Sequence, residues 1–247
     1  MIRISLGNVG SGKTLTEVRE MFINKSNRKY YSNIKTKLKH QFDIKPSMII
    51  NKEIIKEKKL RSGETEAVYK FSLNTQFWKN IKEPINVVLD EAHAIINARR
   101  SMSTKNIIVN DWLSLLRRVL GQSESGYGEL VLITQLFNRI DNIARDMATQ
   151  IRYNVCHYSK ICKDCGNMWN ETSECPEQLW HCGRCGRSNI KKINYSVEVW
   201  HFENSNNYLA WKLYGQKSYY SHYFIKNIEK FFPLYNTLQW ENMFSDD

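Results

Sequence analysis

Residues 7–14 place glycines, a lysine and a threonine at the spacing that binds a triphosphate. The run GNVGSGKT fits the pattern G-x-x-x-x-G-K-[ST] completely, and the helical pattern after it argues against a glycine loop arising by chance. Glycines let the backbone wrap around an anion with its N–H groups pointing inward. Lys13 would reach the β- and γ-phosphates, and the Thr14 hydroxyl would coordinate Mg²⁺. We therefore expect ATP to bind at these residues: Gly7, Asn8, Val9, Gly10, Ser11, Gly12, Lys13, Thr14 and Leu15.

Two acidic residues follow an apolar run at residues 85–89. A carboxylate at the C-terminal end of a neighbouring buried strand lies over the phosphates. Asp90 is expected to hold Mg²⁺ through water, and Glu91 to orient and deprotonate the attacking water. Gln135 ends another apolar run and is expected to sense the γ-phosphate. The alternatives are acids at a helix N-terminus for the pair, and simply the polar end of a strand for Gln135.

Four cysteines form two CxxCG pairs, the pattern of zinc knuckles. They are Cys162, Cys165, Cys182 and Cys185. Two thiolates spaced by two residues can reach one ion in a tight turn, and two such turns complete a tetrahedron. Zn²⁺ is the expected metal, in a structural role because four sulfurs leave no open position. An iron–sulfur cluster and redox-active dithiols are the alternatives.

Positive charge is concentrated in one segment. The 247 residues include 36 Lys and Arg against 25 Asp and Glu, a formal net charge of +11. Residues 25–61 hold twelve of these bases and only three of the acids. Such a concentration favours a polyanionic partner, and we expect double-stranded DNA. A solvated, lysine-rich surface is the alternative.

The sequence argues against membrane insertion and export. No stretch approaches the ~20 consecutive apolar residues that span a bilayer, and residues 1–6 run straight into the glycine loop instead of forming a signal peptide. We expect a cytoplasmic protein whose cysteines bind metal rather than form disulfides.

These residues must be positioned by alternating strands and helices. Apolar runs and alternating patterns predict strands at residues 2–6, 29–34, 67–73, 85–89, 130–134, 151–158, 193–202 and 208–214. Helical spacing predicts helices at residues 13–24, 75–82, 107–120, 138–149 and 221–231. This order predicts an α/β fold, a mostly parallel sheet flanked by helices, with antiparallel strands extending its C-terminal side. The expected parts are a core at 1–158, a zinc-ribbon insertion at 159–189, and strands and a helix at 190–247 that complete the core domain.

Six short motifs resemble those of zonula occludens toxin-like ATPases, which belong to the FtsK–HerA superfamily of ring-forming DNA motors. The motifs are GNVGSGKT, SNI at 32–34, VVLDEAH at 87–93, LITQ at 132–135, IDNIARD at 140–146 and KFFPLYNT at 230–237. The resemblance covers about residues 1–157 and 190–240. It implies a RecA-like P-loop fold, the roles given above for the nucleotide-site residues, and a hexameric or pentameric ring. The group includes phage-assembly proteins and genome-packaging ATPases of archaeal and membrane-containing viruses.

Charge that develops on the γ-phosphate also calls for a rigid cation, usually an arginine from the neighbouring subunit. The sequence does not choose among Arg139, Arg145, Arg152, Arg99, Arg100, Arg117 and Arg118. For each of them a surface ion pair is the alternative.

The motifs and the resemblance together predict a motor that hydrolyses ATP and translocates double-stranded DNA in viral genome packaging. Its partners would include further copies of the chain and a capsid or other virion protein. Phage-assembly members usually carry a membrane helix, so the missing apolar stretch favours the packaging branch. An ATP-dependent switch or docking module without translocation is the alternative, and a small-molecule kinase is disfavoured by Glu91.

Overall fold

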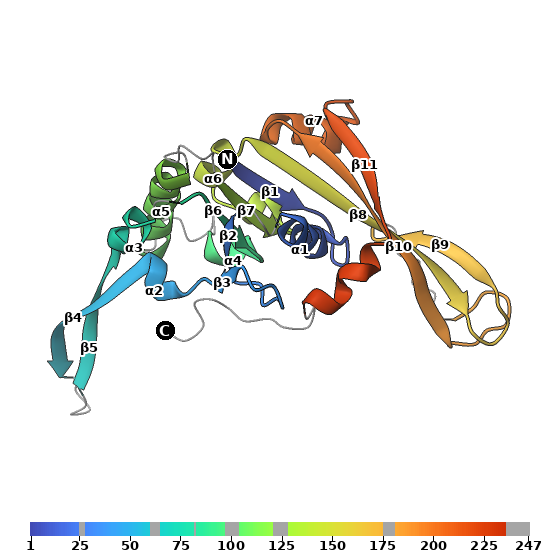
Figure 1. The fold of residues 1–247 in the computed structure, drawn as a ribbon, viewed down its shortest axis with the longest axis horizontal. Coiled ribbons are helices and arrows are strands. Elements are labelled where there is room, and N and C mark those ends of the chain that lie inside the picture. The colour runs from blue at the N-terminus through green and yellow to red at the C-terminus, as the bar shows by residue number, and fades with distance from the viewer. Residues whose placement is uncertain are drawn as a thin grey trace.

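The computed structural model describes residues 1–24, 28–59, 65–81, 83–96, 104–120, 128–174 and 181–235. The parallel strands are β1 (Ile2–Leu6), β2 (Lys29–Ser32), β3 (Gln41–Asp43), β6 (Ile85–Leu89), β7 (Glu129–Thr134) and β8 (Gln150–Cys162). The antiparallel strands are β9 (Met168–Thr172), β10 (Ile190–Phe202) and β11 (Ser221–Lys226). Within the described ranges these nine form one sheet in the order β11-β10-β8-β1-β7-β6-β2-β3, with β9 beside β8 (Figure 1). The predicted α/β class, the mostly parallel sheet and its antiparallel extension are confirmed.

The central strands are buried on both faces. Every residue of β1 and of β6 is buried. The sequence of β6, INVVL, is a nearly continuous apolar run, which is typical of a parallel sheet covered by helices on both sides. The sequence of β1, IRISL, alternates instead, and its polar residues Arg3 and Ser5 are buried on one face.

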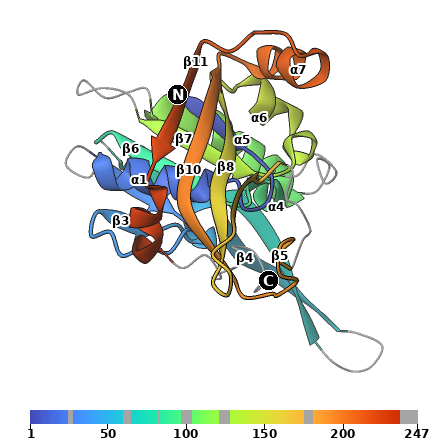
Figure 2. The same cartoon turned by 90° about the vertical axis from the view of Figure 1, so that its right-hand side faces the viewer.

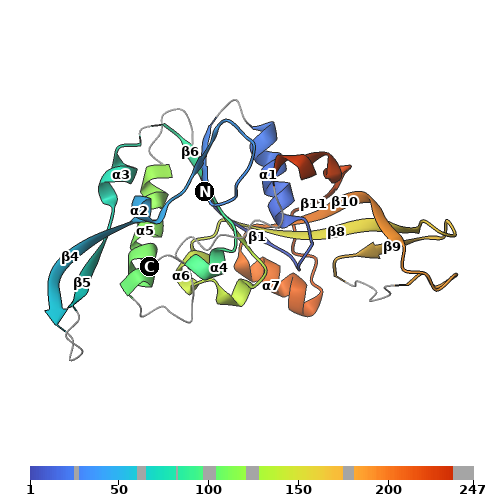
Figure 3. The same ribbon diagram turned by 90° about the horizontal axis from the view of Figure 1, so that it is seen from below.

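Helices cover the two faces of the sheet separately (Figure 3). One face carries α1 (Lys13–Ile23) and η3 (Ile228–Leu234), and Val18 and Met21 of α1 pack there against Val88 and Val131. The other face carries α4 (Ala92–Ile95), α5 (Thr104–Leu120), α6 (Asn142–Asp146) and α7 (Ser205–Tyr214). The apolar stripe of α5, centred on the fully buried Trp112, fills the core beneath this second face.

Two antiparallel arms project at opposite ends of the molecule (Figure 1). The first is the hairpin of β4 (Ile50–Lys59) and β5 (Thr65–Leu73), rooted between α2 (Pro46–Ile49) and α3 (Thr75–Lys79). The second consists of the outer halves of β8 and β10 with β9, and we call it the cysteine arm. Strand β8 passes through residue 158 without interruption, so this arm continues the core sheet. The division of the chain at residues 158 and 189 stays a prediction.

Residues 208–214, predicted as a strand, belong to helix α7 instead. Asn204 caps the helix, since its side chain accepts a hydrogen bond from the backbone N–H of Asn207 at 2.9 Å. Gly215 ends it in the left-handed conformation, with φ at 66°. Over this short stretch the apolar residues fit the period of a helix as well as that of a strand. The two caps that favour the helix, Asn204 and Gly215, lie outside the stretch.

Residues 221–231, predicted as a helix, form β11 followed by η3. All of β11 pairs with the free edge of β10, from Ser196 to His201. Asn227, with φ at 55°, turns the chain from the strand into η3. The prediction was wrong because this segment becomes a strand by pairing with the edge of β10, and its own sequence does not show that partner.

Other predicted elements differ in extent. The helix predicted at residues 138–149 is reduced to α6 and the short 3-10 helix η2 (Phe137–Arg139). Strands β3, β4 and β9 and helix α2 were not predicted. Residues 97–104, whose polar and basic sequence predicts a loop, lie almost wholly outside the described residues. No helix among the described residues is long and apolar enough to span a membrane.

Candidate functional site

The loop between β1 and α1 is packed so tightly that two of its glycines admit no side chain. Gly7 has φ at 150°, and a Cβ there would lie 2.5 Å from the carbonyl oxygen of Asn154. Gly12 has φ at 84° and caps α1, and its Cβ would lie 2.6 Å from the Val197 side chain. The Ser11 hydroxyl is buried and has no hydrogen-bond partner among the described residues. A loop of this shape, opening a helix, with a buried donor left over, fits a phosphate.

Lys13 and Thr14 link this loop to Asp90. The Lys13 ammonium donates to the carbonyl of Asn8 at 3.2 Å, across the loop. Burial lowers the pKa of Lys13, and the nearby carboxylates of Asp90 and Glu91 oppose that shift. The Thr14 hydroxyl donates to Asp90 Oδ2 at 2.9 Å. A hydroxyl and a carboxylate converging in this way fit the oxygen ligands that Mg²⁺ prefers.

Asp90 is held in place by a residue that the sequence analysis assigned no role. The Asn33 side chain accepts from the Asp90 backbone N–H at 2.7 Å and donates to the Asp90 carbonyl at 2.9 Å. Burial raises the pKa of Asp90, against hydrogen bonds from the Glu91 backbone and from Thr14. Asn33 follows β2, which lies next to β6, and its signal in the sequence was its place in the SNI motif at the end of the predicted strand.

Both carboxylate oxygens of Glu91 have a polar partner in the site. Gln135 donates to its Oε1 at 3.2 Å. Nδ1 of His93 lies 3.3 Å from its Oε2 and 3.2 Å from the Thr134 hydroxyl. The Glu91 backbone is in the left-handed region, with φ at 48°, where it caps α4. His93 was also missed, and it was visible only as the last letter of the VVLDEAH motif.

The sites predicted from separate motifs therefore lie at one edge of the sheet. Thr14 touches Asp90, and Gln135 touches Glu91. The loop follows β1, the two acids follow β6 and Gln135 follows β7, three strands that are neighbours in the sheet. Their individual roles in binding and catalysis stay predictions.

A buried ionic cluster attaches α1 to two strands of the sheet, β1 and β8. Glu17 of α1 accepts from Arg3 of β1 at 2.8 Å and from Arg152 of β8 at 3.0 Å. Arg152 is only 3% exposed, so it is not available to a neighbouring subunit. Among the other arginines considered, Arg139 is exposed and lines a cleft of about 520 Å³ beside the chain's own loop.

The remaining arginines do not identify the one that would act in a neighbouring subunit. Arg145 stacks over the Phe137 ring at 5.3 Å. Arg99 and Arg100, and the side chains of Arg117 and Arg118, lie outside the described residues.

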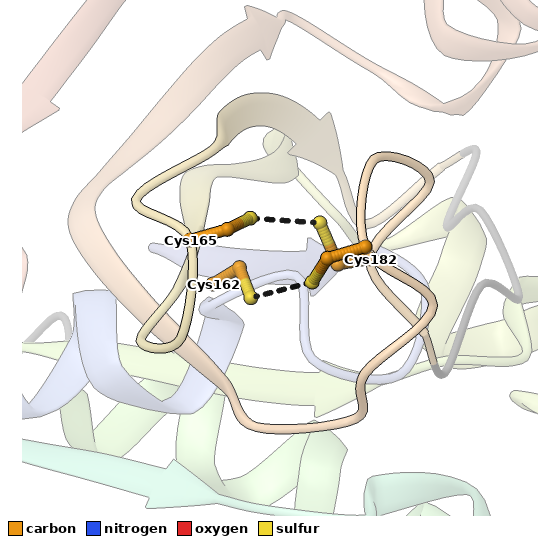
Figure 4. Close-up of side chains that lie close together, drawn as sticks. Cys162, Cys165 and Cys182 are labelled. Atoms are coloured by element: carbon orange, nitrogen blue, oxygen red, sulfur yellow. Dashed lines mark hydrogen bonds between the residues drawn. The ribbon is translucent and has the colours of Figure 1, made fainter.

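The four cysteines of the arm converge on one point (Figure 4). All four sulfurs lie within 4.8 Å of one another. The Cys162–Cys185 and Cys165–Cys182 pairs are each separated by 3.6 Å. With metal–sulfur bonds of about 2.3 Å, a tetrahedral zinc site requires sulfurs about 3.8 Å apart. The observed spacing therefore fits a metal such as zinc.

Two equivalent turns create this cluster. The N–H of Gly166 bonds to the carbonyl of Cys162 at 2.9 Å, and the N–H of Gly186 bonds to the carbonyl of Cys182 at 2.7 Å. Both glycines have φ near 70°. The fifth described cysteine, Cys156, is buried farther down β8, and burial raises the pKa of its thiol to about 11.

A parallel sheet with a glycine loop between its first strand and helix, and acids at the end of a nearby strand, defines a P-loop nucleotide-binding protein. The chain belongs to the zonular occludens toxin (Zot) family, whose model matches residues 1–161. This confirms the resemblance drawn from the sequence motifs. No curated protein matches the sequence.

Solved structures with a similar arrangement come from a bacterium and from viruses. The N-terminal domain of zonular occludens toxin from Neisseria meningitidis is 19% identical, with a TM-score of 0.44, over 95% of this chain and 98% of that one. B204, the DNA-packaging ATPase from Sulfolobus Turreted Icosahedral Virus, is 15% identical, with a TM-score of 0.36, over 62% of this chain and 74% of that one. B204 of Sulfolobus turreted icosahedral virus 2 in complex with AMPPCP is 15% identical, with a TM-score of 0.34, over 62% and 74%.

Proposed function

We propose that the protein hydrolyses ATP and uses the energy to act on double-stranded DNA. The observation that carries the proposal is the contact of Thr14 with Asp90, because it brings the phosphate loop and the acids into one site. Mg²⁺ bound by Thr14 and Asp90 would neutralise charge on the β- and γ-phosphates. Glu91 takes a proton from the attacking water while the oxygen of that water bonds to the γ-phosphorus. The bond from that phosphorus to the bridging oxygen breaks, and ADP leaves with the electron pair.

The basic surface that supports DNA binding begins beside this site. The connection between β2 and β3 starts at Asn33 and carries Lys35, Lys37 and Lys39, all of them exposed. Lysines clustered in this way neutralise backbone phosphates without reading sequence. Since Asn33 also holds the Asp90 backbone, the charged connection is directly joined to the site that would sense nucleotide.

Hydrolysis measured with and without double-stranded DNA tests the proposal. We expect DNA to stimulate turnover, and the stimulation to fall steeply between about 50 and 200 mM salt. Reversing charge in the double variant Lys37→Glu, Lys39→Glu should weaken DNA binding about tenfold and leave the basal rate unchanged. Lys226→Glu, an exposed lysine on β11, is the matched control. An ATP turnover rate that is the same with and without double-stranded DNA at low salt would rule out the motor.

Genome packaging, a ring of five or six subunits and a virion partner are finer parts of the same proposal. The cysteine arm favours one competing function, a nucleotide-dependent docking module, because an arm capped by a rigid knuckle suits a partner protein. Such a module would bind ATP without assembling. Mass measurement with and without ATP separates the two, since a motor that needs an arginine from its neighbour has to form a closed assembly.

A further inference from the structure

The root of the cysteine arm forms a wall beside the phosphate loop. Strand β8 runs parallel to β1, with Tyr153 in register with Leu6, and then continues past the end of β1. Strand β10 accompanies it antiparallel, with Val197 opposite Cys156. The tight approaches of Gly7 to Asn154 and of Gly12 to Val197 show that the loop rests directly on these two strands.

Aromatic rings line this wall next to the first turn of α1. Tyr195 packs on the cluster formed by Leu15 and Val197. Phe232 of η3 meets the Tyr195 ring edge-on at 5.2 Å and is 39% exposed. Figure 2 shows how β11 leads down into η3, which returns across the sheet beside α1. Tyr195 and Phe232 are therefore partly exposed rings from two separate segments, meeting at one end of the phosphate loop.

The sheet order fixes the direction in which a nucleotide would lie. Glu91 and Gln135 follow β6 and β7, on one side of the loop, and the acids must face the γ-phosphate. The wall of β8 and β10 is on the other side of β1. A triphosphate whose terminal phosphate lies at Glu91 and Gln135 must direct its nucleoside away from them, past Thr14 and Leu15, towards the rings.

We propose that the base of the bound nucleoside triphosphate stacks on Tyr195 and Phe232, an inference that rests on the proposed nucleotide site. Aromatic faces recognise the flat surface of a base and not its hydrogen-bonding edge. Bases with similar faces are then bound alike, so ATP and GTP should differ in affinity by no more than about threefold.

The test compares a nonhydrolysable ATP analogue with inorganic tripolyphosphate, which has the phosphates but no base. Tyr195→Ala and Phe232→Ala should each weaken binding of the analogue about tenfold and leave tripolyphosphate binding unchanged. Tyr195→Phe keeps the ring and should behave as wild type. Phe224→Ala, which removes a ring that is 48% exposed on β11, is the matched control and should change neither ligand.

Each outcome separates the base site from the phosphate site. Unchanged affinity for the analogue in both alanine variants would overturn the stacking proposal. An equal loss for both ligands would also overturn it, since the rings would then only support the loop. A wild-type protein that binds tripolyphosphate but not the analogue would overturn the stacking proposal and leave the phosphate site standing. A protein that binds neither ligand would remove the proposed function as well.

Discussion

Glu17 is one residue on which the position of α1 depends. Its side chain is 1% exposed and lies between the guanidinium groups of Arg3 and Arg152, which come from β1 and β8. Burial acts to raise the pKa of Glu17, but the two arginines outweigh it and hold the pKa below its ordinary value of 4.5. The ionised carboxylate therefore stabilises the fold, and it does so through the helix that carries Lys13 and Thr14.

Replacing Glu17 by Gln should lower the free energy of unfolding by about 3–5 kcal/mol at pH 7, because Arg152 loses its carboxylate partner and Arg3 keeps only Glu129, at 3.2 Å. Glu20→Gln, on the same helix but partly exposed beside Arg19, should cost less than about 1 kcal/mol. Since the folded pKa is depressed, the contribution of Glu17 is complete above its unfolded pKa and is lost as the pH falls through the folded one. Urea unfolding of both variants from pH 7 downward measures this. Equal losses for Glu17→Gln and Glu20→Gln would contradict the assignment.

The sequence predicted residues whose chemistry follows directly from a strand end. Asp90, Glu91 and Gln135 each come after a buried apolar run, so their place at the carboxyl edge needed only the parallel order of the strands. Asn33 and His93 act through other residues, on the Asp90 backbone and on the Glu91 carboxylate. Their roles depend on which strands and turns are neighbours in space, and periodicity does not contain that information.

At the scale of elements, the cysteine arm is a pair of long strands whose end is closed by four thiols. The ribbon that these strands form with β9 has little core of its own, so a metal at its tip would supply a cross-link that packing cannot. Cys162 ends β8, and the second knuckle precedes β10, so one ion would join the two strands directly.

We expect the purified protein to contain one zinc per chain, and Cys182→Ser to lose it, because the remaining three thiolates leave the tetrahedron incomplete. Cys156→Ser is the control: that thiol is buried along β8, its pKa is raised by burial, and its loss should leave the zinc content unchanged. Elemental analysis measures both. Iron in place of zinc, or zinc retained in Cys182→Ser, would contradict the proposed site.

Elements were predicted well where their own residues determine them, and badly where a neighbour does. The glycine loop and the strands at 2–6 and 85–89 are set by local pattern and burial. Strand β11 forms because β10 offers it an edge, and its own residues were read as a helix. Helix α7 depends on the caps at Asn204 and Gly215, which flank the alternating stretch that was misread.

At the scale of the whole molecule, the candidate site is assembled from segments far apart in the chain. Residues near positions 13, 33, 91 and 135 meet because β1, β7, β6 and β2 are consecutive in the sheet and all end at one edge. The two arms extend from this body in opposite directions (Figure 1), and the exposed lysines after β2 follow Asn33, which bonds to Asp90. This arrangement would let a change at the γ-phosphate reach the proposed DNA-binding surface over a short path.

ATP binding and turnover of Glu91→Gln, beside wild type and Lys13→Ala, test the central claim most directly. We predict that Glu91→Gln binds ATP as wild type does but turns it over at least about a hundredfold more slowly, because it cannot accept the proton of the attacking water. Lys13→Ala should fail to bind, because it removes the cation beside the β- and γ-phosphates. Wild-type turnover in Glu91→Gln would contradict the account.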